Sequence, residues 1–278
     1  MKRSQPSGSQ AIVFTDMDGT LLDPETYSYR EALPALRVIE EKGIPLVFCS
    51  SKTRKEQEFY RQQLAIRDPF IVEDGGAVII PDDYFPFAFS WDRSVGPYRV
   101  IELGESYSAI RKNLREVVRE TGLKLSGYGD MTVEEVMEKT GLDFAGAKRA
   151  REREYEETVV TELTPAEFRT VSKALEARGL TITRGGKGYG VAGSSGKGRA
   201  ISILADLFRR RYGPVWTVGL GDSQNDVSLL EAVHAPVLVQ KPGNRWEAIE
   251  IPGLYRVRGV GPAGWNRAIL SLFSSRMR

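Results

Sequence analysis

The sequence predicts an α/β protein whose parallel-sheet core is interrupted by an inserted α+β domain. Short apolar runs alternate with helix-like segments in the first 80 and the last 80 residues, and this alternation favours a parallel sheet with right-handed crossovers. Between about residues 84 and 191 the order of strands and helices becomes irregular. With 278 residues, 41% of them hydrophobic, the chain is long enough for two such units with cores of their own.

The first part of the core is expected over residues 11–83, after a flexible polar tail at 1–10. Buried strands are predicted from apolar runs of three to six residues, and helices from the segments between them. Thr53, with Glu56 three residues later, is typical of a helix start. Strands are predicted at 11–15, 44–49 and 70–72, and helices at 31–42 and 53–65.

The inserted domain is predicted over residues 84–191. Residues 81–97, rich in proline, aspartate and aromatic residues, are interpreted as a linker. Gly185-Gly186 indicates a turn in a closing hairpin, and Gly193–Gly196 a hinge. Strands are predicted at 99–103, 158–162, 180–183 and 187–191, and helices at 107–120, within 132–152 and at 164–178.

The second part of the core is predicted over residues 192–278, where the alternating pattern returns. Proline and glycine mark several element ends there. Strands are predicted at 215–219, 236–240 and 254–257, and helices at 197–211, 225–232, 245–250 and from 262 to the end.

Composition excludes several classes of protein. Lys and Arg total 39 and Asp and Glu 37, a net charge of +2, which argues against a dedicated nucleic-acid binder. One cysteine and one histidine exclude a disulfide framework and a cysteine- or histidine-rich metal site. The sequence has no apolar run of the ~20 residues that a bilayer span needs. We therefore expect a soluble cytoplasmic protein, monomeric or homodimeric, without nucleic-acid or membrane partners.

Two acidic motifs follow predicted strands. Asp16 and Asp18, in DMDGT, come directly after the first strand, so both side chains face the crevice at its carboxyl end, where open α/β sheets bind ligands. Asp222 and Asp226, in GDSQND, follow the strand at 215–219. Either motif alone also fits a polar turn or a helix cap. Together they predict a carboxylate cluster that suits Mg²⁺.

Two further motifs offer groups that bind an anion. Ser50, Ser51 and Lys52 follow the second strand, just before a helix start. Lys197 lies where the inserted domain returns to the core, and it could neutralise a phosphate. Taken singly, these residues fit a helix cap and a solvated lysine equally well.

The four motifs, in this order, resemble those of the haloacid-dehalogenase superfamily of phosphohydrolases. The resemblance implies a Rossmann-like core with a mixed α/β cap over the active site. Within the superfamily the chain is similar to the mannosyl-3-phosphoglycerate phosphatases, a family that makes the compatible solute mannosylglycerate. The supporting strings, which cover nearly the whole chain after residue 10, are VFCSSKTRKEQ, FIVEDGGAVIIP, RGGKGYGVAGSSGKG, GLGDSQNDVSLLE and GPAGW.

The resemblance implies a role for each motif. It makes Asp16 the nucleophile that becomes phosphorylated and Asp18 the general acid and base. Mg²⁺ is implied at Asp16, the Asp18 backbone carbonyl and Asp222, with support from Asp226. Ser50 and Lys197 would hold the phosphoryl oxygens. The implied partner is a phosphorylated sugar-glycerate, and the expected substrate-binding residues are Ser51, Lys52, Arg184, Gly185, Gly186, Lys187, Asn225 and Lys241.

The cap strand departs from the family pattern, because Gly188 and Gly190 replace an aromatic residue and a histidine. Three alternatives therefore remain. The chain could be another sugar-phosphate phosphatase, for glucosyl-3-phosphoglycerate or sucrose phosphate. It could be a phosphomannomutase-like phosphotransferase, or a catalytically silent binding module. The charged run at 148–157 is interpreted as a solvated helix face, although Arg153-Glu154-Tyr155 resembles a family string.

Overall fold

The computed structural model describes residues 5–185, 188–194 and 196–274. Its centre is a five-stranded parallel sheet with the order β12-β11-β10-β1-β2. The apolar runs that predicted these strands are buried along nearly their whole length, except in the edge strand β12, as in a sheet covered on both faces. The strands are β1 (Gln10–Thr15), β2 (Leu46–Phe48), β10 (Val215–Gly221), β11 (Ala235–Gln240) and β12 (Tyr255–Val260).

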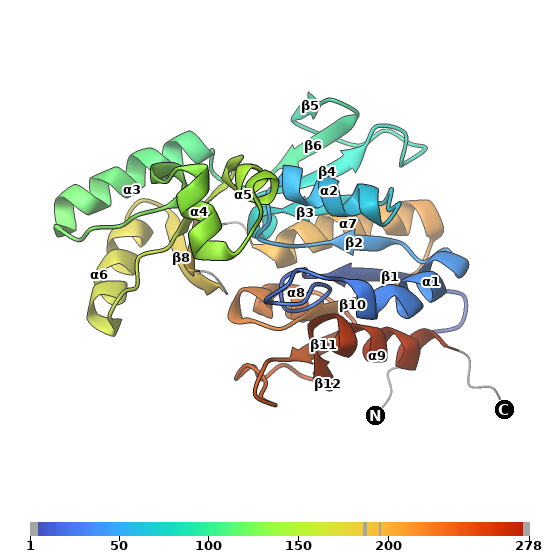
Figure 1. Ribbon diagram of the computed structural model, residues 1–278. Coiled ribbons are helices and arrows are strands. Elements are labelled where there is room, and N and C mark those ends of the chain that lie inside the picture. The colour runs from blue at the N-terminus through green and yellow to red at the C-terminus, as the bar shows by residue number, and fades with distance from the viewer. Residues whose placement is uncertain (1–4, 186–187, 195, 275–278) are drawn as a thin grey trace.

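Helices cover both faces of this sheet (Figure 1). Successive residues of β1 face opposite layers: Ala11 and Val13 pack with α1 and α9, whereas Ile12 and Phe14 pack with α7 and α8. The bounds are α1 (Leu33–Glu41), α2 (Arg54–Gln63), α7 (Lys197–Tyr212), α8 (Val227–Glu231) and α9 (Gly261–Phe273). The predicted α/β core is confirmed.

A second, antiparallel sheet continues the core beyond β2, with the order β3-β4-β6-β5. Its strands are β3 (Phe70–Val72), β4 (Ala77–Pro81), β5 (Arg93–Val95) and β6 (Tyr98–Glu102). A bridge between Cys49 and Ile71 joins the two sheets. The segment interpreted as a linker therefore belongs to the core: Phe85 is buried and packs edge-on against Phe208 of α7, and β6 pairs with β4 rather than with the inserted domain.

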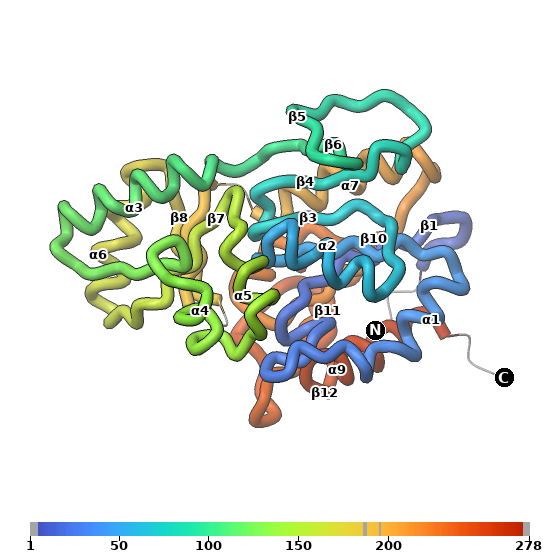
Figure 2. The backbone as a smooth tube through the Cα atoms, turned by 45° about the horizontal axis from the view of Figure 1, so that its top comes forward, coloured from blue at the N-terminus to red at the C-terminus, as the bar shows by residue number. Residues whose placement is uncertain are grey.

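The inserted unit, residues 104–194, is called the cap domain below. Its antiparallel sheet has the order β7-β9-β8, and its helices lie on one side of the molecule, where α5 contacts α2 of the core (Figure 1). The tube view shows the β7 strand and α5 nearest to the core (Figure 2). The elements are α3 (Tyr107–Thr121), α4 (Val133–Thr140), α5 (Phe144–Arg151), β7 (Glu156–Val159), α6 (Pro165–Glu176), β8 (Leu180–Gly185) and β9 (Gly188–Gly193).

Local sequence signals explain most of the helix ends, and local contacts explain why one predicted helix is absent. Thr53, Thr132 and Thr164 each form a capping box with a glutamate three residues on. The helix predicted at 245–250 is absent: Asn244 has a positive φ, and the Trp246 indole donates to the Val257 carbonyl at 3.1 Å, which ties an irregular segment to the sheet. None of the helices in the described residues has the length and apolarity needed to cross a bilayer.

Candidate active site

The sheet order explains why the predicted motifs meet. β10, β1 and β2 are neighbours in one parallel sheet, and each of the three strands carries a motif at its carboxyl end. Asp16 and Asp18 follow β1, Ser50 follows β2, and Asp222 follows β10. Lys197 is the first residue of α7, which packs on the same sheet. The motifs therefore gather at one edge of the core.

Lys197 is the centre of this group. Its ammonium Nζ lies 2.9 Å from Asp16 Oδ1, 2.7 Å from Asp226 Oδ1 and 3.2 Å from Asp74 Oδ1. The lysine is 1% exposed. Burial disfavours its charged form, yet the carboxylates of Asp16, Asp226 and Asp74 raise the pKa of Lys197 well above its ordinary value. A buried cation is thus held beside Asp16 by three carboxylates.

Asp16, Asp222 and Asp226 form a compact acidic group, with one oxygen from each lying within 4.8 Å of the others. Burial and then the charge of Asp226 raise the pKa of Asp16 well above its usual value, and the same causes raise the pKa of Asp222 to about 7. Within the described chain, Asp222 Oδ1 is buried without a hydrogen-bond partner. Asp226 Oδ2, in contrast, accepts the backbone N–H groups of Asp222 and Ser223.

Gly19 is needed beside this group. Its φ is +76°, and a Cβ there would lie 2.8 Å from Asp222 Oδ2. A side chain at this position would therefore displace the Asp222 carboxylate and strain the backbone. The glycine of DMDGT thus lets the loop after β1 approach the loop after β10.

Asp18 lies outside the acidic group and pairs instead with Lys52, at 3.0 Å. Lys52 also reaches Glu56, at 3.4 Å, and lies over the ring of Tyr27. Burial opposes the charge on Lys52, but Asp18 and Glu56 raise its pKa above the ordinary value. Asp18 Oδ1 is a second buried oxygen without a partner in the described residues.

The two serines after β2 have different surroundings. Ser50 is fully buried, and its hydroxyl accepts a long hydrogen bond from the Lys52 backbone N–H, at 3.4 Å. Ser51 lines a cavity of about 200 Å³. Asp16, Asp18, Lys52, Asp222 and Asn225 line the same cavity.

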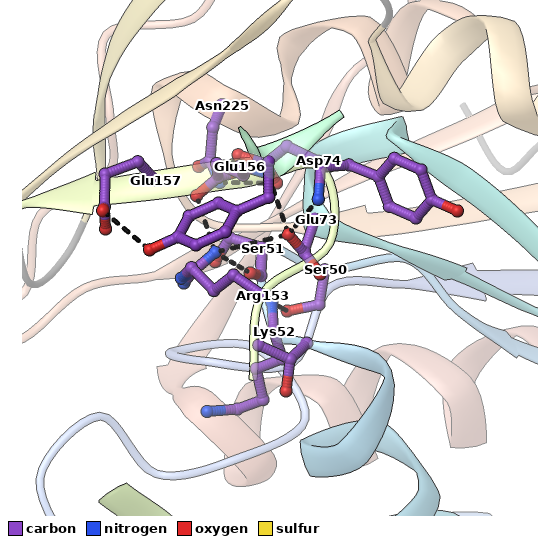
Figure 3. A network of polar contacts seen from close by, with 12 residues as sticks. Ser50, Ser51, Lys52, Glu73, Asp74, Arg153, Glu156, Glu157 and Asn225 are labelled. Carbon is purple, nitrogen blue, oxygen red and sulfur yellow. Dashed lines mark hydrogen bonds and ion pairs between the residues drawn. The ribbon is translucent and has the colours of Figure 1, made fainter. Parts of the chain in front are cut away.

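The cavity lies between the core and the cap domain. Core residues form one wall, and the cap contributes Tyr128, Arg153, Glu156 and the faces of β8 and β9 that include Thr183 and Gly190. Figure 3 shows Arg153 and Glu156 of the cap next to Ser51, Asp74 and Asn225 of the core. Asn225 donates to both carboxylate oxygens of Asp74, at 3.3 and 3.2 Å. The site is therefore a partly enclosed chamber built from both domains.

Not every predicted substrate-binding residue reaches this chamber. Gly185 lines it, but Arg184, its neighbour on β8, does not: alternation along the strand turns Arg184 outward, where its side chain is 71% exposed and pairs with Glu162. Lys241 also does not line the chamber and pairs with Glu247. Gly186 and Lys187 lie outside the described residues.

Glu73 was missed by the sequence analysis. This fully buried core residue accepts backbone N–H groups from Glu154, Tyr155 and Glu156 of the cap, at distances from 2.7 to 3.1 Å. Burial raises the pKa of Glu73 to about 7, although Arg153 and the three N–H groups oppose the rise. Glu73 also has a positive φ, a strained conformation that fixes the carboxylate toward the cap.

The interpretation of residues 148–157 as a solvated helix face is wrong for its second half. α5 ends at Arg151, and β7 begins at Glu156. The Arg153 side chain is 5% exposed and lies 3.4 Å from Glu156, which is 2% exposed. The tertiary contact with the core buries this stretch. The signal that the sequence offered was the string Arg153-Glu154-Tyr155.

Comparisons with known proteins show which family this chain is similar to. Residues 13–87 match the model of the haloacid dehalogenase-like hydrolase family. The chain is 44% identical, over 94% of its length and 96% of the relative's, to a glucosyl-3-phosphoglycerate/mannosyl-3-phosphoglycerate phosphatase of Methanococcoides burtonii. It is 40% identical, over 82% and 90%, to a mannosyl-3-phosphoglycerate phosphatase of Pyrococcus furiosus.

Solved structures share the fold. A haloalkanoate-superfamily phosphatase from Bacteroides thetaiotaomicron matches with a TM-score of 0.67 and 19% identity, over 98% of this chain and 97% of that one. A Thermoplasma acidophilum protein matches with a TM-score of 0.68 and 17% identity, over 95% and 98%. At this identity the likeness extends to the arrangement of core and cap only.

Proposed function

The chain is a phosphatase that belongs to the haloacid dehalogenase-like hydrolases, in one family with the glucosyl-3-phosphoglycerate/mannosyl-3-phosphoglycerate phosphatases, and on this premise we propose that it hydrolyses mannosyl-3-phosphoglycerate to mannosylglycerate and phosphate in the presence of Mg²⁺. The observation that carries the proposal is the chamber, in which Asp16, paired with the buried cation of Lys197, faces a wall contributed by the cap domain.

In the first step, a carboxylate oxygen of Asp16 attacks phosphorus. The bond between phosphorus and the glycerate C3 oxygen breaks, and the carboxyl group of Asp18 gives its proton to the leaving oxygen. Lys197 favours this step because its charge lies 2.9 Å from Asp16 Oδ1, where it can also pair with phosphoryl oxygens. Ser50 and Ser51, at the end of β2, are the hydroxyl-bearing residues proposed to bind the same oxygens.

In the second step, water attacks phosphorus and the bond to Asp16 breaks. The carboxylate of Asp18 takes the proton from this water, so that phosphate leaves and both aspartates return to their starting state. The pairing of Asp18 with Lys52 supports this role, because the lysine orients the carboxylate toward the chamber. The closed cap keeps bulk water away during the first step.

The acidic group fits Mg²⁺, which prefers carboxylate and carbonyl oxygens. Asp222 Oδ1 is buried with no partner among the described residues. The pKa of Asp222 is raised by burial and then by repulsion from Asp226, and a cation would offset both. We propose that Asp16, the Asp18 backbone carbonyl and Asp222 hold the ion, with Asp226 orienting the Asp222 loop. When bound, the ion offsets the repulsion between these carboxylates and a phosphate dianion.

The glycerate carboxylate requires a cation of its own. Among the described residues that line the chamber, the basic ones are Lys52 and Arg153. We assign the carboxylate to Lys52, which lies between the phosphate site and the aromatic ring of Tyr27. Lys187, beyond the described residues, stays a predicted second contact.

The test is phosphate release from a panel of esters. Mannosyl-3-phosphoglycerate should give the highest kcat/KM, glucosyl-3-phosphoglycerate the next, and sucrose phosphate and simple hexose phosphates much lower values. A preference for hexose phosphates would contradict the proposal. So would hexose 1-phosphate isomerisation stimulated by a hexose bisphosphate, which is the signature of a mutase.

Glucosyl-3-phosphoglycerate is retained as a second substrate for a specific reason. The Methanococcoides burtonii relative, which is 44% identical to this chain, is named for both the glucosyl and the mannosyl ester. Equal kcat/KM values for the two esters would establish a dual-specificity enzyme. Activity confined to one of them would assign the preferred sugar.

A further inference from the structure

The cap sheet presents an unusual face to the chamber. Glu156 and Thr158 lie two residues apart on β7 and therefore share one face. The sheet residues that line the chamber bear only a carboxylate, hydroxyls or a hydrogen atom as side chains, and no described residue among them is aliphatic or aromatic. They are Glu156, Thr158, Thr183, Gly185, Gly188 and Gly190.

The pair formed by Arg153 and Glu156 has unused hydrogen-bonding capacity at this face. Within the described chain, Arg153 Nε is a buried donor and Glu156 Oε2 a buried acceptor, and neither has a hydrogen-bond partner. Both side chains line the chamber. Glu157 Oε1 is also unpartnered, but its side chain points to the opposite face, toward Tyr107 and Arg111. Of the unpartnered atoms in the described part of the cap, those of the Arg153–Glu156 pair can therefore meet a ligand in the chamber.

The chemistry of the pair selects the kind of ligand group. A neighbouring donor and acceptor match a hydroxyl, which both accepts and donates. A ligand carboxylate is disfavoured, because it would be repelled by the unpartnered Oε2 of Glu156 and by Glu73, which lies 4.0 Å from the Arg153 guanidinium. An apolar group would leave both atoms unpaired. The absence of a side chain at Gly190 preserves this arrangement, since a Cβ there would lie 3.0 Å from Glu156 Oε1.

We propose that Glu156, paired with Arg153, binds hydroxyl groups of the substrate's hexose and so makes the cap sheet the sugar-binding wall of the chamber. This inference rests on the proposed function, since it assumes a glycosylated phosphoglycerate. The glycerate carboxylate then points to Lys52 on the core side, and the hexose lies against Thr158 and Thr183. Glu156 is a specificity-determining residue here and takes no part in phosphoryl transfer.

The test compares two substrates that differ only in the sugar, mannosyl-3-phosphoglycerate and 3-phosphoglycerate. Glu156→Gln keeps the size of the side chain but replaces one acceptor oxygen by a donor. We expect kcat/KM for the glycosylated ester to fall about ten- to a hundredfold, the value of a charge-assisted hydrogen bond. The value for 3-phosphoglycerate should change by less than about threefold. An equal fall for both esters, or no fall for either, would overturn the inference.

Glu157→Gln is the matched control. Glu157 is the next residue on β7, is equally buried and also pairs with an arginine, but it faces away from the chamber. Its substitution should not change the ratio of the two kcat/KM values. Deoxy-sugar analogues sharpen the comparison. With the wild type, the analogue that lacks the contacted hydroxyl should have a lower kcat/KM than the full substrate. With Glu156→Gln, removing that hydroxyl should cause no further fall in kcat/KM.

Two further measurements keep the inference testable in every case. If Glu156→Gln does not fold, Thr158→Val removes a hydroxyl from the same face and leaves all ion pairs intact, and a selective loss with the glycosylated ester is again expected. An unselective effect of Thr158→Val would then overturn the inference. The wild-type preference for the glycosylated ester is measured separately, so a failure of the proposed function is seen before any variant is compared.

Discussion

The two charged clusters of the chamber are built in opposite ways. In the core, Asp16 follows β1 and Asp226 lies in the segment after β10, and both pair with Lys197 at the start of α7, at 2.9 and 2.7 Å. In the cap, Arg153 and Glu156 line the chamber next to backbone N–H groups that Glu73 of the core accepts. Strand order therefore brings the residues of the proposed reaction centre together, whereas the cap side of the chamber depends on how the cap is docked.

Asp16→Asn should produce the largest effect, because an amide oxygen is a poor nucleophile. We expect kcat to fall by at least about 10⁴-fold, equally for the glycosylated ester and for a small generic ester such as p-nitrophenyl phosphate. Steady-state phosphate release measures both. Thermal unfolding of the variant serves as the control for folding. A rate above a few per cent of wild type would show that the core cluster is not where the chemistry occurs.

Metal removal and substitution test which aspartates of the core cluster hold the proposed Mg²⁺ ion. Activity should vanish with chelator and return with Mg²⁺. Asp222→Asn should raise the Mg²⁺ concentration for half-maximal rate by about a hundredfold and Asp226→Asn by about tenfold. The difference arises because Asp226 already bonds Lys197 and two backbone N–H groups, whereas Asp222 Oδ1 is free of protein partners in the described residues. Superimposable Mg²⁺ titrations of the two variants would refute this ordering.

Glu73→Gln tests how the cap is held. The substitution removes the charge that accepts three cap N–H groups and leaves buried donors poorly paired. Stability should fall by about 1–3 kcal/mol, measured by urea unfolding. Glu41→Gln, at an exposed position on α1, should stay within about 0.5 kcal/mol of wild type. If both variants unfold like the wild type, the cap is held by other contacts.

Arg184→Ala should have the smallest effect. Its guanidinium is exposed, pairs with the exposed Glu162 and lies outside the chamber. The kcat/KM for mannosyl-3-phosphoglycerate should change by less than about fivefold, the range for a surface ion pair. Lys187→Ala, at a residue beyond the described chain, is the variant to measure beside it. A large, substrate-selective loss with Arg184→Ala would mean that the β8 strand turns its other face to the substrate.

Local patterns were sufficient for the core site. The apolar runs before Asp16 and Asp222 predicted β1 and β10 because buried parallel strands are apolar on both faces. The motifs that follow these two strands could then be placed close together without further information, since parallel strands bring their carboxyl ends to one edge. The limits of this reasoning appear in β6, which was assigned to the cap but pairs with β4. Antiparallel pairing between distant segments leaves no local mark by which the partner can be chosen.

The sequence by itself therefore determined the α/β class and the presence of an inserted domain, and it predicted the aspartates and the lysine that the structure brings together, because each depends on periodicity or on a motif at the end of an element. Only the tertiary structure decided the cap side of the chamber. It buried Arg153 and Glu156 within a charged run that resembles a solvated helix face, and it turned Arg184 outward. The physical reason is that burial of a charged residue depends on partners far along the chain: Glu73 lies about 80 residues before the N–H groups that it binds.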